Sequence, residues 1–464
     1  MTLPSALGIA VVGSGYTSAS ILTHLLDLQP ELAAQITVFG PGPFGHGAAF
    51  GTAHPDFRLN VRAQIMQLRP ARPDVFPAWA EQNIEDKTAH CAEGAFYRRA
   101  DFARYLNTEI EKLPHSDEVS FCAQRVISAD FDNGSALWHL VREDGQFHTA
   151  ETLILATGNP TPDWPCPIDE ACWPEAHSLL IRSPWSGTWL DKIDPGDEIV
   201  VVGGGLTAMD AVYALGRAGH RGRIRIVTPV GLLPPAQTDW IPYEAVTWPD
   251  DIDSASEFIR FFNRRLKANK RYDWTDTVWQ SRFEALRVHL NPVWRRLADS
   301  EKRRLMAHLG AFWSLARYRS APQTNAMATQ LQNSGQLELL TGRVVHISAA
   351  ADPGRLSAHL ASGETLPADG IVNCTGMGRD PLLADMLTTG VVRADAFGRG
   401  PGLGDDLRLC TPSGQPYPSA YALGALTAGS EGDVVGATTI SRQAAALARH
   451  MHLSESQKQK RNQF

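Results

Sequence analysis

The chain has 464 residues, of which 43% are hydrophobic and 20% charged, and its net charge is −7 at pH 7. This composition is typical of globular proteins and excludes a disordered or fibrous chain. The negative charge offers no basic field for nucleic acid, and no apolar run approaches the roughly 20 residues that span a bilayer. We therefore expect a cytoplasmic protein of two or three domains that binds neither nucleic acid nor membrane.

The first predicted unit lies near the start of the chain and reads strand, turn, helix, strand. Residues 9–12 are an apolar run, a Gly-x-Gly turn and a helical pattern follow, and residues 35–39 form a second apolar run. In such a unit the first glycine permits a tight bend, and the second lets a pyrophosphate approach the positive end of the helix. The residues predicted to bind a dinucleotide here are Gly13, Gly15, Tyr16, Thr17 and Ser18.

The same plan returns near the middle of the chain. Residues 198–202 precede a second Gly-x-Gly turn and helix, residues 223–227 form the next strand, and each half closes on a strand ending in Thr-Gly. Two such units predict an α/β protein with two Rossmann-like dinucleotide-binding domains. The further predicted cofactor residues are Gly203, Gly205, Leu206, Thr207 and Ala208, with Thr157, Gly158, Thr375 and Gly376 at the closing strands.

Both units lack the acidic residue expected after their second strand. Gly40 stands there in the first unit and Thr228 in the second. An acid in the second unit would bind the ribose of NAD and repel the 2′-phosphate of NADP. Its absence favours NADP, as do the arginines crowded at positions 217, 221, 223 and 225, of which Arg225 is the predicted cofactor contact. A solvated surface is the alternative for at least two of these arginines.

Further motifs spread over nearly the whole chain. They include Phe44-Gly45-His46-Gly47, Phe57-Arg58-Leu59-Asn60, Tyr97-Arg98-Arg99, Arg317-Tyr318-Arg319 and Tyr421-Ala422-Leu423-Gly424. With the order of the units, these motifs resemble a bacterial family of NAD(P)/FAD-binding proteins. That family is related to N-hydroxylating and class B flavin monooxygenases, within the two-dinucleotide-binding flavoproteins that also include thioredoxin-reductase-like enzymes.

The resemblance implies that the first unit holds FAD and the second holds the nicotinamide cofactor. It divides the chain into a discontinuous FAD-binding domain, residues 1–165 and 376–464, and an NADP-binding domain, residues 190–375. A helical, tryptophan-rich insert at residues 232–325 interrupts the second domain. The implied flavin contacts are Gly45, Asn60, Gln64, Met66 and Gly424, with Asp433 or Glu431 compensating for Ala425, where reductases of this architecture often have an aspartate.

The choice of reaction is made partly by elimination. A disulfide reductase needs two neighbouring cysteines near the flavin, and the nearest pair, Cys166 and Cys172, sits in a connector. No metal-ligand pattern stands out. The resemblance then favours a monooxygenase that uses FAD, NADPH and O₂, through a flavin hydroperoxide, to N-hydroxylate a small amine or amino acid. An oxygen-independent dehydrogenase or reductase and a non-catalytic redox-sensing flavoprotein remain alternatives.

Two arginines at the end of the insert are candidates for holding the substrate. Arg317 and Arg319 precede Pro322, and a guanidinium can clamp a carboxylate through two hydrogen bonds. The equal alternative is that both arginines form salt bridges between domains.

Overall fold

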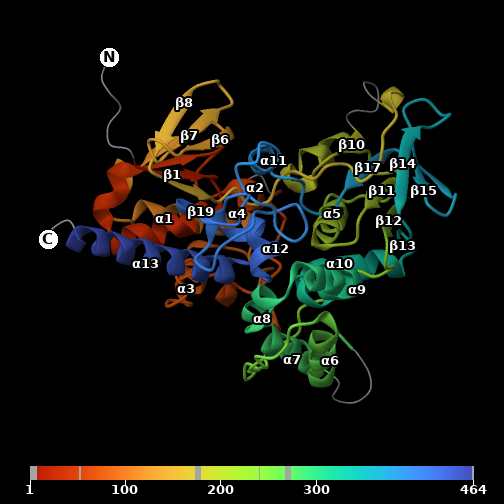
Figure 1. The fold of residues 1–464 in the computed structure, drawn as a ribbon. Coiled ribbons are helices and arrows are strands. Elements are labelled where there is room, and N and C mark those ends of the chain that lie inside the picture. The colour runs from red at the N-terminus through yellow and green to blue at the C-terminus, as the bar shows by residue number, and fades with distance from the viewer. Residues whose placement is uncertain (1–7, 52–53, 173–178, 240, 267–272, 462–464) are drawn as a thin grey trace.

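The computed structural model describes residues 8–51, 54–172, 179–239, 241–266 and 273–461, so Trp240 of the insert and Thr52 lie outside it. Figure 1 shows two lobes, each with a sheet at its centre, and a group of helices below them. Within the described residues, no helix is long and apolar enough to cross a membrane.

The first lobe contains a six-stranded sheet in the order β18-β19-β9-β1-β2-β5. Its strands are β1 (Ile9–Val12), β2 (Ile36–Phe39), β5 (Ser120–Cys122), β9 (Thr152–Leu155), β18 (Arg408–Cys410) and β19 (Pro416–Ala422). All neighbours are parallel except β18 and β19 at the edge. The chain thus returns to the first sheet near its C-terminus, after forming the second lobe.

The second lobe repeats this arrangement with five parallel strands in the order β10-β17-β11-β12-β13. They are β10 (Leu180–Ile181), β11 (Ile199–Val202), β12 (Ile224–Thr228), β13 (Leu337–Thr341) and β17 (Gly370–Asn373). In both sheets the strand before the Gly-x-Gly turn lies at the centre. The predicted α/β class with two Rossmann-like units is confirmed.

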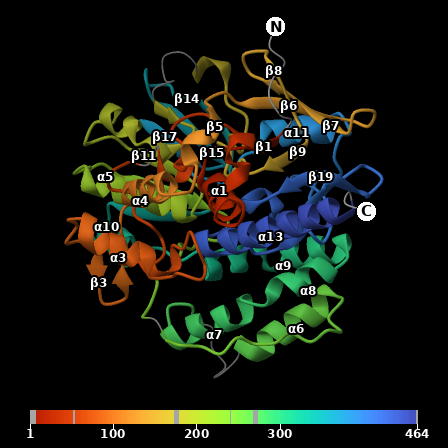
Figure 2. The same cartoon turned by 90° about the vertical axis from the view of Figure 1, so that its left-hand side faces the viewer.

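Each sheet is buried on both faces, as apolar runs in parallel strands require. In the first, Ile9 and Val11 pack against α1 (Tyr16–Leu28) and α13 (Ala437–Arg461), which lie side by side in Figure 2. Ala10 and Val12 face the antiparallel sheet of β6 (Val126–Asp132), β7 (Leu137–Arg142) and β8 (Phe147–Ala150), together with α11 (Pro381–Thr388).

The second sheet has the same layers. One face packs against α5 (Leu206–Arg217) and α10 (Pro322–Asn333). The other packs against the antiparallel sheet of β14 (Val344–Ala349), β15 (Leu356–Leu360) and β16 (Thr365–Ala368). Short elements complete the first lobe: α2 (Gly47–Phe50), α3 (Val75–Asn83), β3 (His90–Cys91), β4 (Gly94–Ala95), α4 (Arg99–Glu111) and α12 (Ala428–Glu431).

The insert folds into helices around its own core. They are α6 (Ala255–Leu266), α7 (Thr277–Arg287), α8 (Leu290–Arg296) and α9 (Asp299–Arg317). Trp248, Trp279 and Trp294 are buried there, and Trp274 and Trp313 pack against them. The described tryptophans of the insert therefore form its hydrophobic core.

Candidate dinucleotide-binding site

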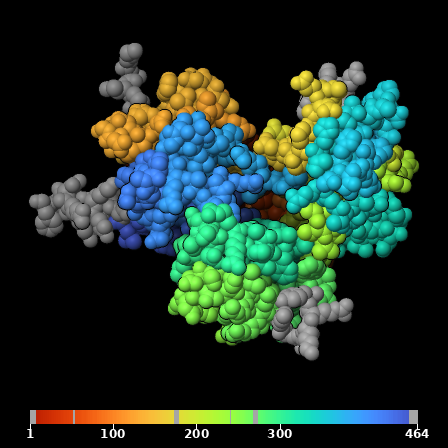
Figure 3. Space-filling view, turned by 45° about the vertical axis from the view of Figure 1, so that its right-hand side comes forward, coloured from red at the N-terminus to blue at the C-terminus, as the bar shows by residue number. Residues whose placement is uncertain are grey.

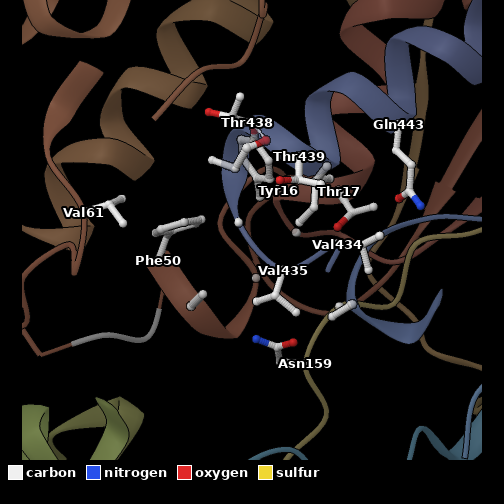
Figure 4. A pocket seen from close by; sticks show the side chains of 18 of the residues that line it. Tyr16, Thr17, Phe50, Val61, Asn159, Val434, Val435, Thr438, Thr439 and Gln443 are labelled. Atoms are coloured by element: carbon white, nitrogen blue, oxygen red, sulfur yellow. Dashed lines mark hydrogen bonds between the residues drawn. The ribbon is translucent and has the colours of Figure 1, made fainter. Parts of the chain in front are cut away.

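A single large cavity lies where the lobes and the insert meet. Its volume is about 2670 Å³, several times the roughly 300–1,000 Å³ of a drug-sized pocket. Figure 3 shows the surface hollowed between the lobes above the insert. In Figure 4, Tyr16 and Thr17 of α1 and Thr438 of α13 lie on one side, and Phe50 and Asn159 lie below them.

The two glycines of each turn have different surroundings. A Cβ on Gly13, whose φ is +126°, would lie 2.2 Å from the Ala156 carbonyl oxygen, and one on Gly203 would lie 2.4 Å from that of Cys374. These glycines therefore let the turn pass the neighbouring strand. A Cβ on Gly15 would meet nothing nearer than 3.5 Å, and one on Gly205 nothing within 4 Å.

Open space at the second glycine is what a pyrophosphate needs. The first helical hydrogen bond of α1 runs from Ala19 N to Gly15 O, so the preceding amides have no partner inside the helix. The first helical hydrogen bond of α13 runs from Ile440 N to Gly436 O, and residues 437–439 line the same cavity. Two positive helix ends therefore face one space. The second turn contributes Leu206 and Thr207, at the start of α5.

The missing acid has a packing explanation in the first half. In the first, a Cβ on Gly40 would lie 2.9 Å from the Ser14 Cβ, and Ser14 donates a hydrogen bond to the Pro41 carbonyl. In the second half the glycine is on the turn and the side chain is on the strand: a Cβ on Gly204 would lie 2.8 Å from the Thr228 Cβ. In each half, one of the two contacting positions is a glycine, and in the first half this contact leaves no room for a side chain at Gly40.

The cavity brings together most of the predicted residues. Lining it are Gly13, Gly15, Tyr16, Thr17, Asn60, Gln64, Met66, Thr157, Gly158, Leu206, Thr207, Arg317, Arg319 and Asp433. Outside its lining are Ser18, Gly45, Gly203, Gly205, Ala208, Arg225, Thr375, Gly376 and Gly424.

Several residues outside the lining support the site through packing. The Ser18 hydroxyl donates to Gly13 O at 2.6 Å, and Ala208 is fully buried. A Cβ on Gly424 would lie 2.7 Å from Thr17 Oγ1. Tyr16 is also structural: its hydroxyl lies 2.6 Å from Gln67 O and 2.9 Å from Ala437 O, and burial raises the pKa of its phenol, which stays protonated.

The prediction that Arg225 contacts the cofactor is wrong. Arg225 pairs in register with Val200, near the amino end of the sheet, and its guanidinium donates to Glu198 at 3.1 Å and to Pro367 O. The Gly-x-Gly turn lies at the opposite, carboxyl edge. Arg217 ends α5, and Arg221 and Arg223 precede β12, so none of the four arginines lies where β12 ends.

Arg317 and Arg319 do not offer a free clamp for a substrate carboxylate. Arg317 Nε donates to both carboxylate oxygens of Asp433, at 2.9 and 3.1 Å, and its Nη2 donates to Val435 O. Arg319 Nη2 donates to Glu284 at 3.0 Å. Arg317 therefore forms the salt bridge between domains that was the alternative, whereas Arg319 pairs with Glu284 inside the insert.

These pairs belong to a larger charge network. Arg287 donates to Asp433 at 2.7 Å and forms a salt bridge with Glu284 at 2.7 Å. Burial alone would raise the pKa of Glu284, but Arg287, Arg319 and Arg317 outweigh it and lower that pKa to about 2. Burial lowers the pKa of Arg319 to about 10 against the opposing effect of Glu284. The network joins the insert to the segment before α13.

Sequence reasoning missed Asn159, Trp185 and residues 434–436, all of which line the cavity. Asn159 directly follows Thr157-Gly158, a position that the pattern of the first unit could have indicated. Residues 434–436 carry no motif, and only the approach of α13 to α1 brings them to the cavity. All six cysteines lie within the described residues, and none lines the cavity.

Residues 10–160 match the model of a family described as FAD-NAD(P)-binding. No curated protein sequence matches the chain. Among solved structures, ornithine N-hydroxylase from Kutzneria sp. 744 has a TM-score of 0.62 and 14% identity, covering 97% of this chain and 100% of its own. Ornithine hydroxylase from Pseudomonas aeruginosa has a TM-score of 0.63 and 15% identity, and the match covers 96% of this chain and 99% of its own.

A bacillithiol disulfide reductase from Staphylococcus aureus also matches, with a TM-score of 0.54 and 12% identity, covering 97% of this chain and 98% of its own. Identities this low establish the fold and not the reaction. The chain therefore carries a FAD-NAD(P)-binding domain at residues 10–160 and, over nearly its whole length, the two-dinucleotide-binding flavoprotein fold.

Proposed function

We propose that the protein is an FAD-dependent, NAD(P)H-using monooxygenase that N-hydroxylates a small amine or amino acid. The observation that carries this proposal is one continuous cavity that joins the first turn to the start of α5 and contains no cysteine. Electrons from a nicotinamide cofactor then have no protein disulfide to reach. The two ornithine hydroxylases that share the fold support this choice over disulfide reduction.

The residues present fit the two cofactors. We assign the FAD pyrophosphate to the open space at Gly15 and the start of α1, and the flavin end to residues 434–439 and Asn159. The nicotinamide cofactor is assigned to the turn at Gly205 with Leu206 and Thr207. When bound, NADPH would supply through FAD the hydride equivalent that, with one further proton, converts RNH₂ and O₂ into RNHOH and water.

This chain's own residues would bind, orient and exclude water. The insert encloses the cavity from below with Gln237, Tyr243, Gln280 and Asn291. Gln237 donates to Asn60 O at 2.6 Å, which fixes the insert loop against the first lobe. Excluding water from the reacting atoms would suppress side reactions. We also propose the domain division given above and a cytoplasmic location.

The proposal is tested with purified protein. We expect a yellow protein with stoichiometric FAD, and NADPH oxidation in air that one member of an amine panel, such as ornithine, lysine or a diamine, stimulates. Mass spectrometry should then find that amine heavier by one oxygen atom. An oxygen-independent dehydrogenase would instead reduce an organic acceptor under nitrogen. A redox sensor would hold its reduced flavin for many minutes in air, and either result would contradict the monooxygenase.

A further inference from the structure

With Arg225 paired elsewhere, none of the arginines at positions 217, 221, 223 and 225 lies at the carboxyl end of β12, beside the second turn. A phosphate on the adenosine ribose would lie beyond the carboxyl end of β12, because the pyrophosphate sits at the start of α5. A suitable cation must therefore come from a segment that leaves the sheet at that edge. The chain leaves it there where β13 ends and β14 begins (Figure 1).

The two halves of the chain have equivalent strand pairing at the point where the chain leaves the parallel sheet for the antiparallel sheet. In the first, Phe39 of β2 pairs with Cys122 of β5; in the second, Val227 of β12 pairs with Leu340 of β13. Three positions beyond the paired residue, each half has an arginine, Arg125 or Arg343. Each is followed by the valine that opens the antiparallel sheet.

The hydrogen bonds around the two arginines are also equivalent. Glu143 N donates to Arg125 O at 2.9 Å, and Ala361 N donates to Arg343 O at 2.9 Å. The valine that follows each arginine is 6% exposed in both halves. The next side chains are exposed to the same degree, 47% for Ile127 and 46% for Val345. Arg343 thus occupies the place in the second half that Arg125 occupies in the first.

In the first half this place belongs to the dinucleotide cavity. Arg125, Val126 and Ile127 line the cavity together with residues 39–43, at the end of β2 and directly after it. That is the side on which the adenosine of a dinucleotide lies in this fold. The equivalence puts Arg343 beside the adenosine of the second dinucleotide.

Contacts in the second half connect Arg343 to its turn. Gly204 of the turn faces Thr228 at the end of β12, since a Cβ on Gly204 would lie 2.8 Å from the Thr228 Cβ. The Thr228 carbonyl accepts a hydrogen bond from Gly342 N at 3.0 Å. Arg343 follows directly. A short path along the carboxyl edge therefore runs from the turn to this arginine.

The guanidinium of Arg343 can pair with a ligand anion. Its residue is exposed, and within the described parts of the chain no carboxylate forms a salt bridge with it. Arg225 and Arg355 differ, because Glu198 binds both and Asp369 binds Arg355. Thr228 leaves the ribose side without a negative charge that would repel a phosphate.

We propose that Arg343 binds the 2′-phosphate of NADPH and sets the preference of this protein for NADPH over NADH. The proposal rests on the assignment of the second turn to the nicotinamide cofactor. A guanidinium and a phosphate form charge-assisted, two-pronged hydrogen bonds, and NADH has no group to receive them.

The test is calorimetry on the FAD-loaded protein with adenosine 2′,5′-bisphosphate and with 5′-AMP. Arg343→Ala should weaken binding of the bisphosphate by roughly tenfold or more and leave binding of 5′-AMP within about twofold. Arg343→Lys should recover part of the loss. Arg223→Ala, which removes an exposed arginine at the amino end of β12, is the matched control and should change neither ligand.

Equal losses for both ligands in Arg343→Ala, or no loss for either, would overturn the assignment of Arg343. A loss in Arg223→Ala as large as that in Arg343→Ala would overturn the argument from the sheet edge. Failure of the unmodified protein to bind either ligand would contradict the nicotinamide site itself, and with it this proposal. FAD content and melting temperature show whether each variant is folded.

Discussion

At the residue scale, the two Gly-x-Gly turns show how one backbone geometry tolerates opposite side-chain choices. Ser14 faces Gly40 in the first half, and Gly204 faces Thr228 in the second. Either arrangement fills the contact between the turn and the following strand. The sequence shows the missing acid in both halves. The contact that excludes a side chain at Gly40 joins residues 26 positions apart, which no local pattern pairs.

The different surroundings of the two glycines in the first turn give a prediction. Gly15→Val should fold, because the backbone there is extended, with φ −96°, and a Cβ would meet only Gly47, at an ordinary contact distance of 3.5 Å. Its side chain would fill the proposed pyrophosphate site, so we expect a large loss of bound FAD with little change in the melting temperature of the apoprotein. Flavin absorbance per mole of protein and thermal unfolding measure the two effects.

Gly13→Val is the matched comparison. Its Cβ would lie 2.2 Å from the Ala156 carbonyl oxygen at a φ of +126°, so this variant should lose stability even without FAD. If Gly15→Val bound FAD stoichiometrically, the first turn would not be the pyrophosphate site.

At the element scale, the insert and the segment before α13 hold one another. Asp433 N donates to Asn291 Oδ1 at 3.0 Å, Arg317 donates to Val435 O at 2.8 Å, and Trp294 Nε1 donates to Gly429 O. Helices α8 and α9 therefore fix the residues that line the cavity beside Asn159. The arginine motif at the end of α9 serves this attachment.

The helices of the insert were predictable, and their attachment was not. Their boundaries follow from apolar periodicity within short windows of sequence. Asp433, by contrast, is 116 positions from Arg317 along the chain, and no local pattern pairs them. For the same reason the sequence left a substrate clamp and a salt bridge equally open. The error at Arg225 was avoidable, because the residue precedes Val227 within its strand and so lies before the carboxyl edge.

The charge network predicts a change in acid stability. The lowered pKa of Glu284, about 2 against 4.5, contributes about 3 kcal/mol above pH 4.5. This contribution is lost as the pH falls from 4.5 towards 2. Glu284→Gln should therefore lower the melting temperature strongly at pH 7, and the difference from the unmodified protein should shrink at pH 3.

Thermal unfolding at both pH values measures this difference. Asp250→Asn is the control, since Asp250 is a fully exposed acid of the insert, 3.8 Å from Arg296, and exposed pairs contribute little. A deficit in Glu284→Gln that is equal at pH 7 and pH 3 would contradict the role assigned to this carboxylate.

At the scale of the whole molecule, the two lobes are joined by a buried ion pair. Arg99 of α4 in the first lobe donates to Asp210 of α5 in the second at 2.9 Å, and Trp185 stacks on the Arg99 guanidinium at 4.6 Å. The side chain of Asp210 is 2% exposed. The two helices that meet here both adjoin the cavity, because Arg99, Leu206 and Thr207 line it.

The protonation of Asp210 is set by burial. Burial raises its pKa to about 6, against the opposing charge and hydrogen bond of Arg99. The folded state then binds this proton more tightly than the unfolded state, so the contribution of Asp210 to stability rises as the pH falls from about 6 towards 4. Removing Arg99 should raise the pKa further, because the carboxylate would lose its only ion-pair partner among the described residues.

Arg99→Leu should therefore destabilise the protein in a pH-dependent way. We expect a loss of about 3–5 kcal/mol at pH 8, where the unpaired buried carboxylate must either stay charged or take up a proton from a dilute supply, and a smaller loss at pH 5.5, where Asp210 is protonated readily. Denaturant unfolding at a fixed FAD concentration measures both. The double variant Arg99→Leu/Asp210→Leu should recover most of the loss at pH 8, because it leaves no buried charge. A loss that is the same at both pH values, or a double variant no more stable than the single one, would show that packing and not charge joins the lobes here.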